Sequence, residues 1–549
     1  MEKFIRFKRL PFVLLCFLFI ATGYTQNLES KIDKLLESKY KPDQPGATAL
    51  VAKDGKVIYR KAFGNANLEL DVEMKPENVF EIGSMTKQFT AVSILMLLEQ
   101  NKLNLDDEIT KFIPDYPTQG KTIKVHHLLN HTSGIKSYTS MQSFMKLARN
   151  DMSPSELIDV FKNEPMDFDP GEKYLYNNSA YIILGYIIEK LSGQTYADFV
   201  EKNIFKKINM NSSHYGSMTK LIENRANGYQ KRDGYVNADY LSLTLPYAGG
   251  SLMSNVDDML KWQQALNNNI FIKKETIAKA FTNYTLNNSK KINYGYGWSH
   301  NLIHDTPTIE HGGGIFGYTT MGVYVPDEDV YVVVLTNCNC NSPTEVAVKI
   351  AALTIGKPFP EIENRVALQQ NELEKWVGAY EFEGEIIRYI TLENGQLYSQ
   401  RAGSSKFKIF PLDSNRFYFD GTMSEYVFSM NNGKRETLFK SRINVDKGNE
   451  TNKKPIEKES IVIKPAILKE YVGKYELQPN FLITVTMKGD QIFGQATGQP
   501  QFEMFAESTT NFFLKVVQAK IVFNKNDKGK VSSLILYQNG QELKGHKIE

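Results

Sequence analysis

An internal repeat near the C-terminus constrains the fold of this chain more than any other feature of its sequence. The segment LEKWVGAYE at Leu373–Glu381 returns as LKEYVGKYE at Leu468–Glu476, an offset of 95 residues. At that offset, without a gap, fourteen positions of residues 373–428 are identical, whereas composition alone predicts about three. Both copies show aromatic, alternating segments and no long helical pattern. We therefore expect two copies of one small antiparallel β-barrel domain.

The repeat also sets the domain boundaries that we predict. The polar stretch NVDKGNETNKKPIEKES at Asn444–Ser460 separates the two copies and is typical of a linker. The predicted division is a signal peptide over 1–25, a catalytic domain over 26–360, a first barrel over 361–443, a linker over 444–463 and a second barrel over 464–549.

The first 360 residues combine strand and helix patterns. The runs ATALVAK and KVIYRKAF meet at Asp54 and Gly55, a strong hairpin turn. Two more strands are expected much later, at Gly317–Val325 and Val330–Thr336. Between these two pairs the apolar periodicity is helical, over 86–100, 155–161, 180–191 and 256–267. The predicted fold class is α/β, with a sheet built from both ends of the segment and a helical insertion between them.

Composition excludes some partners and cofactors. The 65 basic and 62 acidic residues are scattered and leave a net charge of +3, so no basic stripe is present for nucleic acid. No sequence resembles a phosphate loop or a dinucleotide fingerprint, so no cofactor is expected. His126, His127 and His131 lack zinc-type spacing, and no metal is expected either. Cys338 and Cys340, two apart on an expected strand, are near the limit for bridging, so we expect no disulfide framework.

The N-terminal residues have the pattern of an export signal. Four basic residues among the first nine precede the uncharged stretch Leu10–Ile20, and the small residues Ala21 and Gly23 follow. This order is typical of a secretory signal peptide. A membrane-spanning helix needs roughly 20 apolar residues, so a permanent anchor is the weaker alternative. We expect a periplasmic or secreted protein whose mature chain begins between Tyr24 and Asn27.

The candidate nucleophile lies in the segment EIGSMTK at Glu81–Lys87. The run FTAVSILMLLEQ that follows is apolar on nearly every side, which predicts a buried helix that Ser84 would open. Positions three apart share a helix face, so the Lys87 amine can reach the Ser84 hydroxyl. Burial would lower the pKa of Lys87 and let it accept a proton, and the Ser84 N–H would face an oxyanion. The alternative is that Ser84 only caps the helix and Lys87 is a solvated first-turn residue.

A second segment, LYNNSAYIILGYIIEKLSG at Leu175–Gly193, places Tyr176 and Asn178 just before another amphipathic helix. With the SxxK serine, this YxN element about 90 residues later and a final HxG strand, the chain resembles the penicillin-recognising SxxK serine hydrolases. That family includes class C β-lactamases, DD-peptidases and related esterases and D-aminopeptidases. The resemblance covers about the first 345 residues, and four further blocks occur in family order: LLNHTSGI at 128–135, PYAGGSLMS at 246–254, YGYGW at 294–298 and HGGGIFGY at 311–318.

The resemblance implies a β-lactamase-like fold, an antiparallel sheet flanked by helices plus a helical subdomain, followed by the two barrels. It assigns proton transfer to Tyr176 and hydrogen bonding of the substrate amide to Asn178. It assigns the second oxyanion N–H to Gly314, and it places His311 and Gly313 on the same strand as residues that bind the substrate. The alternative for His311 is a structural histidine. By itself Tyr176 could be a half-buried packing residue. The block around His131 implies a turn that supports the pocket.

His311 departs from the lysine of typical β-lactamases, whose cation helps to bind the antibiotic carboxylate. Efficient β-lactam hydrolysis is therefore not expected. The expected function is an exported serine hydrolase that cleaves small peptides or amides, including those of D-amino acids, through an acyl-enzyme. The alternatives are a carboxylesterase that uses the same residues, and a catalytically idle sensor or binding protein that retains the fold. The intact set of Ser84, Lys87 and Tyr176 favours an enzyme, because a binding module needs none of this chemistry.

Overall fold

A computed structural model describes residues 27–402, 404–453, 460–478, 481–497, 499, 501–515, 519–538 and 541–548. The chain divides into two compact units, one that ends at Phe359 and one that begins at Pro360. The predicted signal peptide lies outside the described residues. Within those residues we find no helix with the length and apolar character that a membrane span requires.

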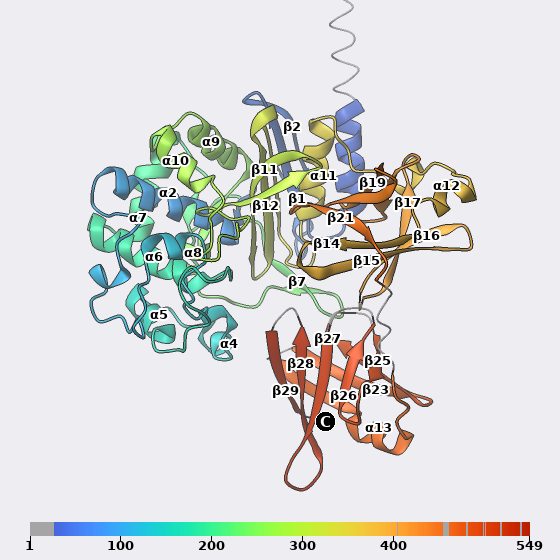
Figure 1. Ribbon diagram of the computed structural model, residues 1–549. Helices are drawn as coiled ribbons and strands as arrows, with labels where there is room; N and C mark the ends of the chain where they lie inside the picture. Colours follow the sequence, from blue (N-terminus) through green and yellow to red (C-terminus); the bar gives the residue numbers. More distant parts are fainter. Residues whose placement is uncertain are drawn as a thin grey trace, which may run out of the picture. The chain divides into compact units, whose positions relative to one another are not determined.

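The first unit is built around a six-stranded antiparallel sheet (Figure 1). The order of its strands is β10-β11-β12-β13-β1-β2, so the two ends of the segment meet where β13 pairs with β1. The strands are β1 (Ala47–Lys53), β2 (Lys56–Phe63), β10 (Ser299–Ile303), β11 (Thr306–Ile315), β12 (Tyr318–Val325) and β13 (Val330–Thr336). This arrangement confirms the predicted sheet and its hairpin at Asp54 and Gly55.

Helices cover both faces of this sheet. On one face α9 contacts β13 and β1, and on the other α11 contacts β12 and β13 (Figure 1). A helix over 27–39 precedes β1. The named helices of this unit are α2 (Thr86–Glu99), α3 (Val125–Leu129), α4 (Phe144–Leu147), α5 (Pro154–Phe161), α6 (Asn178–Ser192), α7 (Tyr196–Val200), α8 (Tyr247–Gly250), α9 (Val256–Asn267), α10 (Lys274–Ala280) and α11 (Thr344–Thr354). Shorter strands form three small sheets: β3 (Asn65–Asn67) with β4 (Val72–Glu73), β5 (Phe80–Glu81) with β9 (Leu252–Ser254) and β6 (His214–Tyr215), and β7 (Tyr229–Lys231) with β8 (Tyr235–Asn237).

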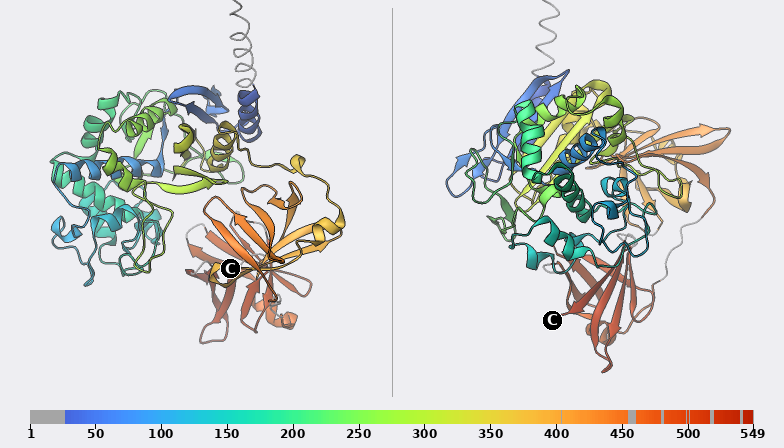
Figure 2. Two further views of the ribbon diagram at one scale, coloured as in Figure 1. Left: turned by 45° about the horizontal axis from the view of Figure 1, so that its top comes forward. Right: turned by 90° about the vertical axis from the view of Figure 1, so that its left-hand side faces the viewer.

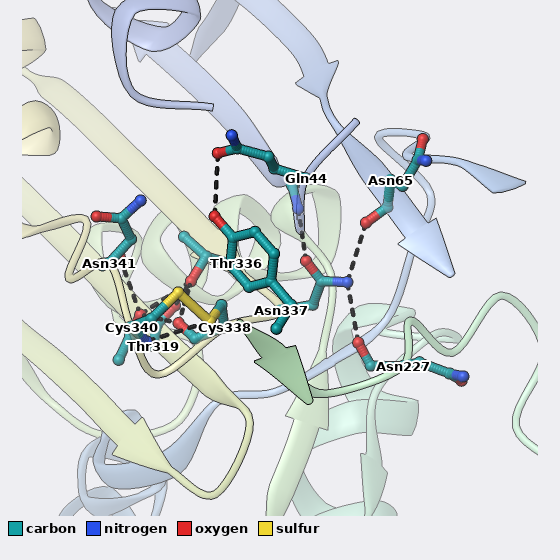
Figure 3. Close-up of a disulfide and its surroundings, with 11 residues drawn as sticks. Gln44, Asn65, Asn227, Thr319, Thr336, Asn337, Cys338, Cys340 and Asn341 are labelled. Atoms are coloured by element: carbon teal, nitrogen blue, oxygen red, sulfur yellow. Dashed lines mark hydrogen bonds between the residues drawn. A yellow bond between two sulfur atoms is a disulfide. The ribbon is translucent and has the colours of Figure 1, made fainter. Parts of the chain in front are cut away.

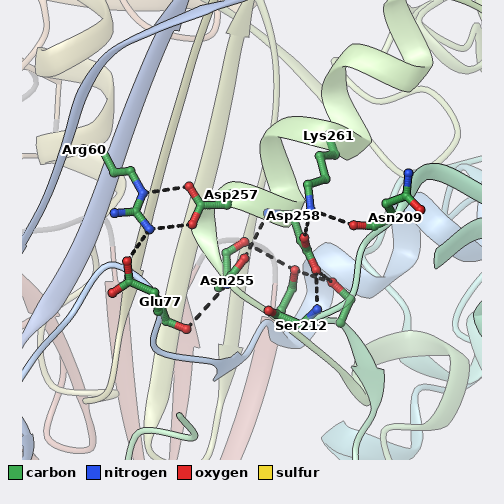
Figure 4. A network of polar contacts seen from close by, with 10 residues as sticks. Arg60, Glu77, Asn209, Ser212, Asn255, Asp257, Asp258 and Lys261 are labelled. Atoms are coloured by element: carbon green, nitrogen blue, oxygen red, sulfur yellow. Dashed lines mark hydrogen bonds and ion pairs between the residues drawn. The ribbon is translucent and has the colours of Figure 1, made fainter. Parts of the chain in front are cut away.

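A polar network fixes the N-terminus of α9 to the sheet (Figure 4). Arg60 on β2 donates from Nε and Nη2 to the two carboxylate oxygens of Asp257, at 2.8 and 2.7 Å. Asn255 caps the helix by accepting from the N–H of Asp258 at 2.9 Å. The Asp258 carboxylate in turn accepts from Ser212 N–H and Lys261 Nζ. The bidentate pair therefore joins α9 to the β1–β2 hairpin.

A disulfide closes the turn after β13 (Figure 3). It joins Cys338 to Cys340, whose Cα atoms are 5.2 Å apart. Our expectation of no disulfide is therefore contradicted. The reason is that β13 ends at Thr336, so the chain turns between Cys338, which forms an isolated bridge with Tyr229, and Cys340. Asn337, between strand and disulfide, accepts from Gly46 N–H and donates to the carbonyl of Asn65, which ties this turn to the start of the sheet.

The second unit contains two closed eight-stranded antiparallel barrels (Figure 2), as the repeat predicts. The first consists of β14 (Gly378–Phe382), β15 (Ile386–Glu393), β16 (Gln396–Arg401), β17 (Lys406–Pro411), β18 (Arg416–Phe419), β19 (Glu425–Asn431), β20 (Lys434–Lys440) and β21 (Val445–Thr451). The second consists of β22 (Gly473–Gln478), β23 (Phe481–Lys488), β24 (Gln491–Ala496), β25 (Phe502–Ala506), β26 (Asn511–Leu514), β27 (Ala519–Lys525), β28 (Val531–Gln538) and β29 (Gln541–Lys547). A short helix precedes each barrel, α12 (Gln370–Glu374) and α13 (Pro465–Tyr471).

One predicted boundary within this unit is wrong. The segment predicted as a linker, 444–463, contains β21, which pairs with β20 and β14 and closes the first barrel. Its sequence, VDKGNET, is polar because only Gly448 among its residues is buried. A strand with so little buried surface lacks the apolar alternation on which the prediction depended.

Candidate active site

Ser84 lies in the turn that connects β5 to α2. A 3₁₀ turn over Gly83–Met85 precedes the α-helix, which begins at Thr86, so Ser84 stands just before the helix and does not open it. Gly83 has φ +51°, and a Cβ there would lie 2.9 Å from the N atom of Gly314 on β11. The glycine therefore allows the turn to approach β11 closely, and it brings Ser84 beside the glycine strand.

Lys87 is fully buried behind Ser84, with 0% of its surface exposed. Its Nζ is 3.2 Å from Ser84 Oγ, 2.8 Å from Asn178 Oδ1 and 2.8 Å from the carbonyl oxygen of Gly249. The carbonyl and the amide oxygen can only accept hydrogen bonds. A neutral Lys87 amine can donate its two protons to the Asn178 and Gly249 oxygens. Its lone pair then faces the Ser84 hydroxyl and can accept the proton of that group. The contacts therefore orient Lys87 as the proton acceptor.

Burial also adjusts the acidity of Lys87. Loss of hydration lowers the pKa of its ammonium from 10.5 to about 7. No carboxylate forms an ion pair with Lys87 among the ion pairs of the described residues. A substantial fraction of the amine is therefore neutral near pH 7, as a general base requires.

Tyr176 and Asn178 are positioned by the start of α6. Asn177 caps that helix, with its Oδ1 accepting from Ala180 N–H at 2.9 Å. Asn178 Nδ2 donates to Thr139 Oγ1, which fixes the amide so that Oδ1 faces Lys87. The Lys87 Nζ lies 4.9 Å from the centroid of the Tyr176 ring. Burial raises the pKa of Tyr176 well above its usual value of 10, so its hydroxyl keeps its proton at neutral pH.

His131 holds the segment that carries Tyr176. Its Nδ1 accepts from Asn177 N–H at 3.1 Å, and its carbonyl accepts from Leu175 N–H at 3.1 Å. The His131 ring lies 4.3 Å from the ring of Tyr176, centroid to centroid. This is the supporting turn that we expected at this block. Its two hydrogen bonds hold Leu175 and Asn177, the residues on either side of Tyr176.

The glycine segment of β11 lies directly against the serine turn. A Cβ on Gly313 would lie 2.0 Å from the carbonyl oxygen of Ile82, whereas one on Gly314 would meet nothing within 4 Å. The neighbouring strand β10 pairs with β11 only as far as Glu310. Beyond that point β11 has β12 on one side and an open edge on the other. Gly314 is therefore exposed at this open edge.

His311 is buried and neutral. Its Nδ1 donates to the carbonyl of Gly312 at 2.6 Å, so its Nε2 accepts from the Tyr294 hydroxyl at 2.9 Å. Burial, with the nearby Lys87 charge, lowers the pKa of His311 to about 4. His311 therefore supplies no cation where typical β-lactamases have a lysine.

Three contributors to this site were not assigned a role from the sequence. The carbonyl of Gly249 lies in the block PYAGGSLMS and accepts from Lys87; Thr139 orients Asn178; and Tyr294, in the block YGYGW, binds His311. The last two depend on side-chain contacts that no spacing reveals. The first had a usable signal in the sequence, the glycine pair Gly249 and Gly250 within that block, because glycines allow a close approach of the backbone.

Two family models and a characterised bacterial protein match the sequence of this chain. A family model described as Beta-lactamase matches residues 28–354, and one described as a domain of unknown function, DUF3471, matches residues 457–547. Penicillin-binding protein 4* of Bacillus subtilis is 30% identical over 435 residues, which is 74% of this chain and 94% of that protein.

Two solved structures extend the comparison. The octameric penicillin-binding protein homologue from Pyrococcus abyssi is 27% identical, with a TM-score of 0.54 over 77% of this chain and 99% of that one. The D-amino acid amidase from Ochrobactrum anthropi SV3 shares the fold at 21% identity, with a TM-score of 0.53 over 60% of this chain and 99% of that one.

Proposed function

Because the chain belongs to the Beta-lactamase family, we propose that it is an exported serine hydrolase that cleaves amide bonds through an acyl-enzyme on Ser84. One observation carries this proposal: a fully buried lysine whose amine contacts the Ser84 hydroxyl and two groups that can only accept. A sensor or binding protein has no need of a base in that position.

In the proposed reaction, Ser84 Oγ forms a bond to the substrate carbonyl carbon while its proton passes to Lys87 Nζ. The negative oxygen that develops accepts from the N–H groups of Ser84 and Gly314. Removal of one such donor typically slows catalysis by about a hundred- to a thousandfold. Both are backbone groups, one in the 3₁₀ turn of Ser84 and one on strand β11, so they need little reorganisation as the charge forms.

Tyr176 completes the proton path. Its raised pKa keeps the hydroxyl protonated, so it can give its proton to the leaving nitrogen as the C–N bond breaks and regain one from the Lys87 ammonium. Water then attacks the acyl carbon and passes a proton to Lys87, which gives it to Ser84 Oγ as the bond between Oγ and the acyl carbon breaks. The Tyr176 hydroxyl is buried and interacts with Ser84, which partly offsets the effect of burial on its pKa.

The proposed substrates are small neutral amides or peptides of D-amino acids. A neutral His311 offers no charge to a substrate carboxylate, so β-lactams should be poor substrates. The preference for a D-residue is inferred from the resemblance to a family that includes D-aminopeptidases, and the amidase that shares the fold makes D-amino acid amides reasonable first compounds. Export follows from the N-terminal signal pattern, which lies outside the described residues.

Turnover of matched substrates tests the proposal. We expect kcat/KM for D-alanine p-nitroanilide to exceed that for the L-enantiomer by at least about tenfold, and Ser84→Ala to abolish both. Phenyl esters of the same two amino acids form the second pair. Hydrolysis of the esters alone would replace amide cleavage with carboxylesterase activity, and equal rates for the enantiomers would remove the D-residue assignment.

A further inference from the structure

The two barrels are copies of one fold, yet their interiors differ at one end. Strand register makes the comparison residue by residue: Tyr380 pairs with Arg388 in the first barrel, and Tyr475 pairs with Ile483 in the second. Arg388 shares its strand face with the core residue Ile390, so it faces the barrel interior. An arginine inside the first barrel thus occupies the position of a buried isoleucine in the second.

Three more positions at this end change in the same direction; two of them, Ser399 and Tyr426, are buried, and the third, Arg401, is exposed at the end of its strand. In the first barrel Tyr426 donates or accepts a hydrogen bond with Ser399 at 2.8 Å, both side chains being buried. The first-barrel residues Ser399, Arg401 and Tyr426 correspond by register to Gly494, Ala496 and Ile521. The second barrel therefore closes this end with apolar residues, whereas the first has two guanidinium groups and two hydroxyls.

The two arginines lie on neighbouring strands. Arg388 and Arg401 are directly opposite each other in the β15–β16 pair, where like charges destabilise a sheet. The Arg388 guanidinium lies over the ring of Phe439, 3.9 Å from its centroid, and 5.7 Å from the centroid of Phe382. Of the ion pairs between described residues, none includes Arg388 or Arg401. The aromatic rings hold Arg388 in place and do not neutralise it.

One carboxylate lies on the same rim. Asp446 pairs with Phe439 in the strand register, and its Oδ1 accepts from Asn444 Nδ2 at 2.8 Å. It forms no ion pair with either arginine among the described contacts. The opposite end of the barrel is filled, because Trp376 is buried there and stacks on Phe428 at 5.3 Å.

Stability does not explain these residues. Arg388 is half-buried without a carboxylate partner and so loses part of its hydration, which lowers stability, whereas Arg401 is exposed at the strand end. The second barrel shows that isoleucine and alanine complete the same fold. Eight-stranded barrels of this size either fill with side chains or hold one small ligand. Two arginines, two hydroxyls and aromatic walls are the groups that bind a planar anion with an apolar body.

We propose that the end of the first barrel lined by Arg388, Arg401, Ser399 and Tyr426 binds a small carboxylate with an aromatic or aliphatic body. The carboxylate pairs with the guanidinium groups, and the apolar body lies among Phe382, Phe419 and Phe439. This site is independent of Ser84 and of any hydrolytic reaction.

Calorimetric titration of the full-length protein with phenylacetate tests the proposal, with phenylacetamide as the uncharged isostere. We expect phenylacetate to bind the wild-type protein, phenylacetamide to show no Arg388-dependent binding, and Arg388→Ile to weaken phenylacetate binding by at least tenfold. Arg388→Lys should weaken it less. Arg232→Gln, which removes an exposed arginine elsewhere, is the control and should bind as the wild type does.

Thermal unfolding of the same variants separates binding from structure. Because Ile483 fills the equivalent position, Arg388→Ile should unfold at a temperature no lower than the wild type. A lower midpoint together with unchanged phenylacetate affinity would make Arg388 a structural residue and overturn the site. If inorganic phosphate binds as tightly as phenylacetate and depends equally on Arg388, the carboxylate assignment is wrong.

Discussion

Replacing Lys87 with methionine should lower kcat/KM by at least about a hundredfold, within the range of 10² to 10⁴ typical of general acid–base groups. Methionine fills a similar volume, so the buried site should stay packed while the proton acceptor is lost. The wild-type rate should rise with pH through about 7, because the neutral amine is the active form and its pKa is about 7. The variant should lack that dependence.

The same pKa shift predicts that stability, like activity, rises with pH. Between pH 7 and 10.5 the unfolded chain keeps the Lys87 proton and the folded protein releases it. The free energy of unfolding of the wild type should therefore rise with pH over this interval, relative to that of Lys87→Met. Denaturant unfolding at pH 6.5 and 10 measures the difference. Wild-type turnover in Lys87→Met, or an unchanged pH profile, would show that another group is the base.

Removal of the Tyr176 hydroxyl should also slow turnover by at least about a hundredfold. Tyr176→Phe keeps the ring that packs on His131 and removes only the proton donor. The loss should be larger for an anilide than for a phenyl ester, because an amine leaving group needs a proton more than a phenolate does. Tyr174→Phe, on the exposed neighbour, is the matched control.

A thermal midpoint within the error of the wild-type value would show that Tyr176→Phe acts on chemistry and not on folding. Equal losses for anilide and ester would place Tyr176 in the activation of Ser84 instead of the protonation of the leaving group.

The sequence predicted those features that repeat or that follow from local periodicity. The helix over 256–267 and the strand Val330–Thr336 have the bounds that their apolar patterns predict, and the 95-residue repeat predicted both barrels. The SxxK spacing predicted the contact between Ser84 and Lys87 because a helical turn fixes it. These features depend on a few consecutive residues.

Features that depend on distant contacts were missed or predicted incorrectly. Strand β21 has one buried residue and therefore no apolar alternation in its sequence. It is a strand because it pairs with β20. The disulfide depends on where β13 ends, and the carbonyl of Gly249 reaches Lys87 across 162 residues of chain. The change from Ile483 to Arg388 is visible in the aligned repeats, but its position inside the barrel follows only from the strand register.

Covalent labelling tests the central claim most directly. After reaction with a fluorophosphonate, intact-mass measurement should show one adduct per chain, and peptide mapping should locate it on Ser84. The Ser84→Ala variant should gain no mass and should lose turnover with every substrate that the wild type cleaves. An adduct on another serine, or undiminished turnover in Ser84→Ala, would contradict the account.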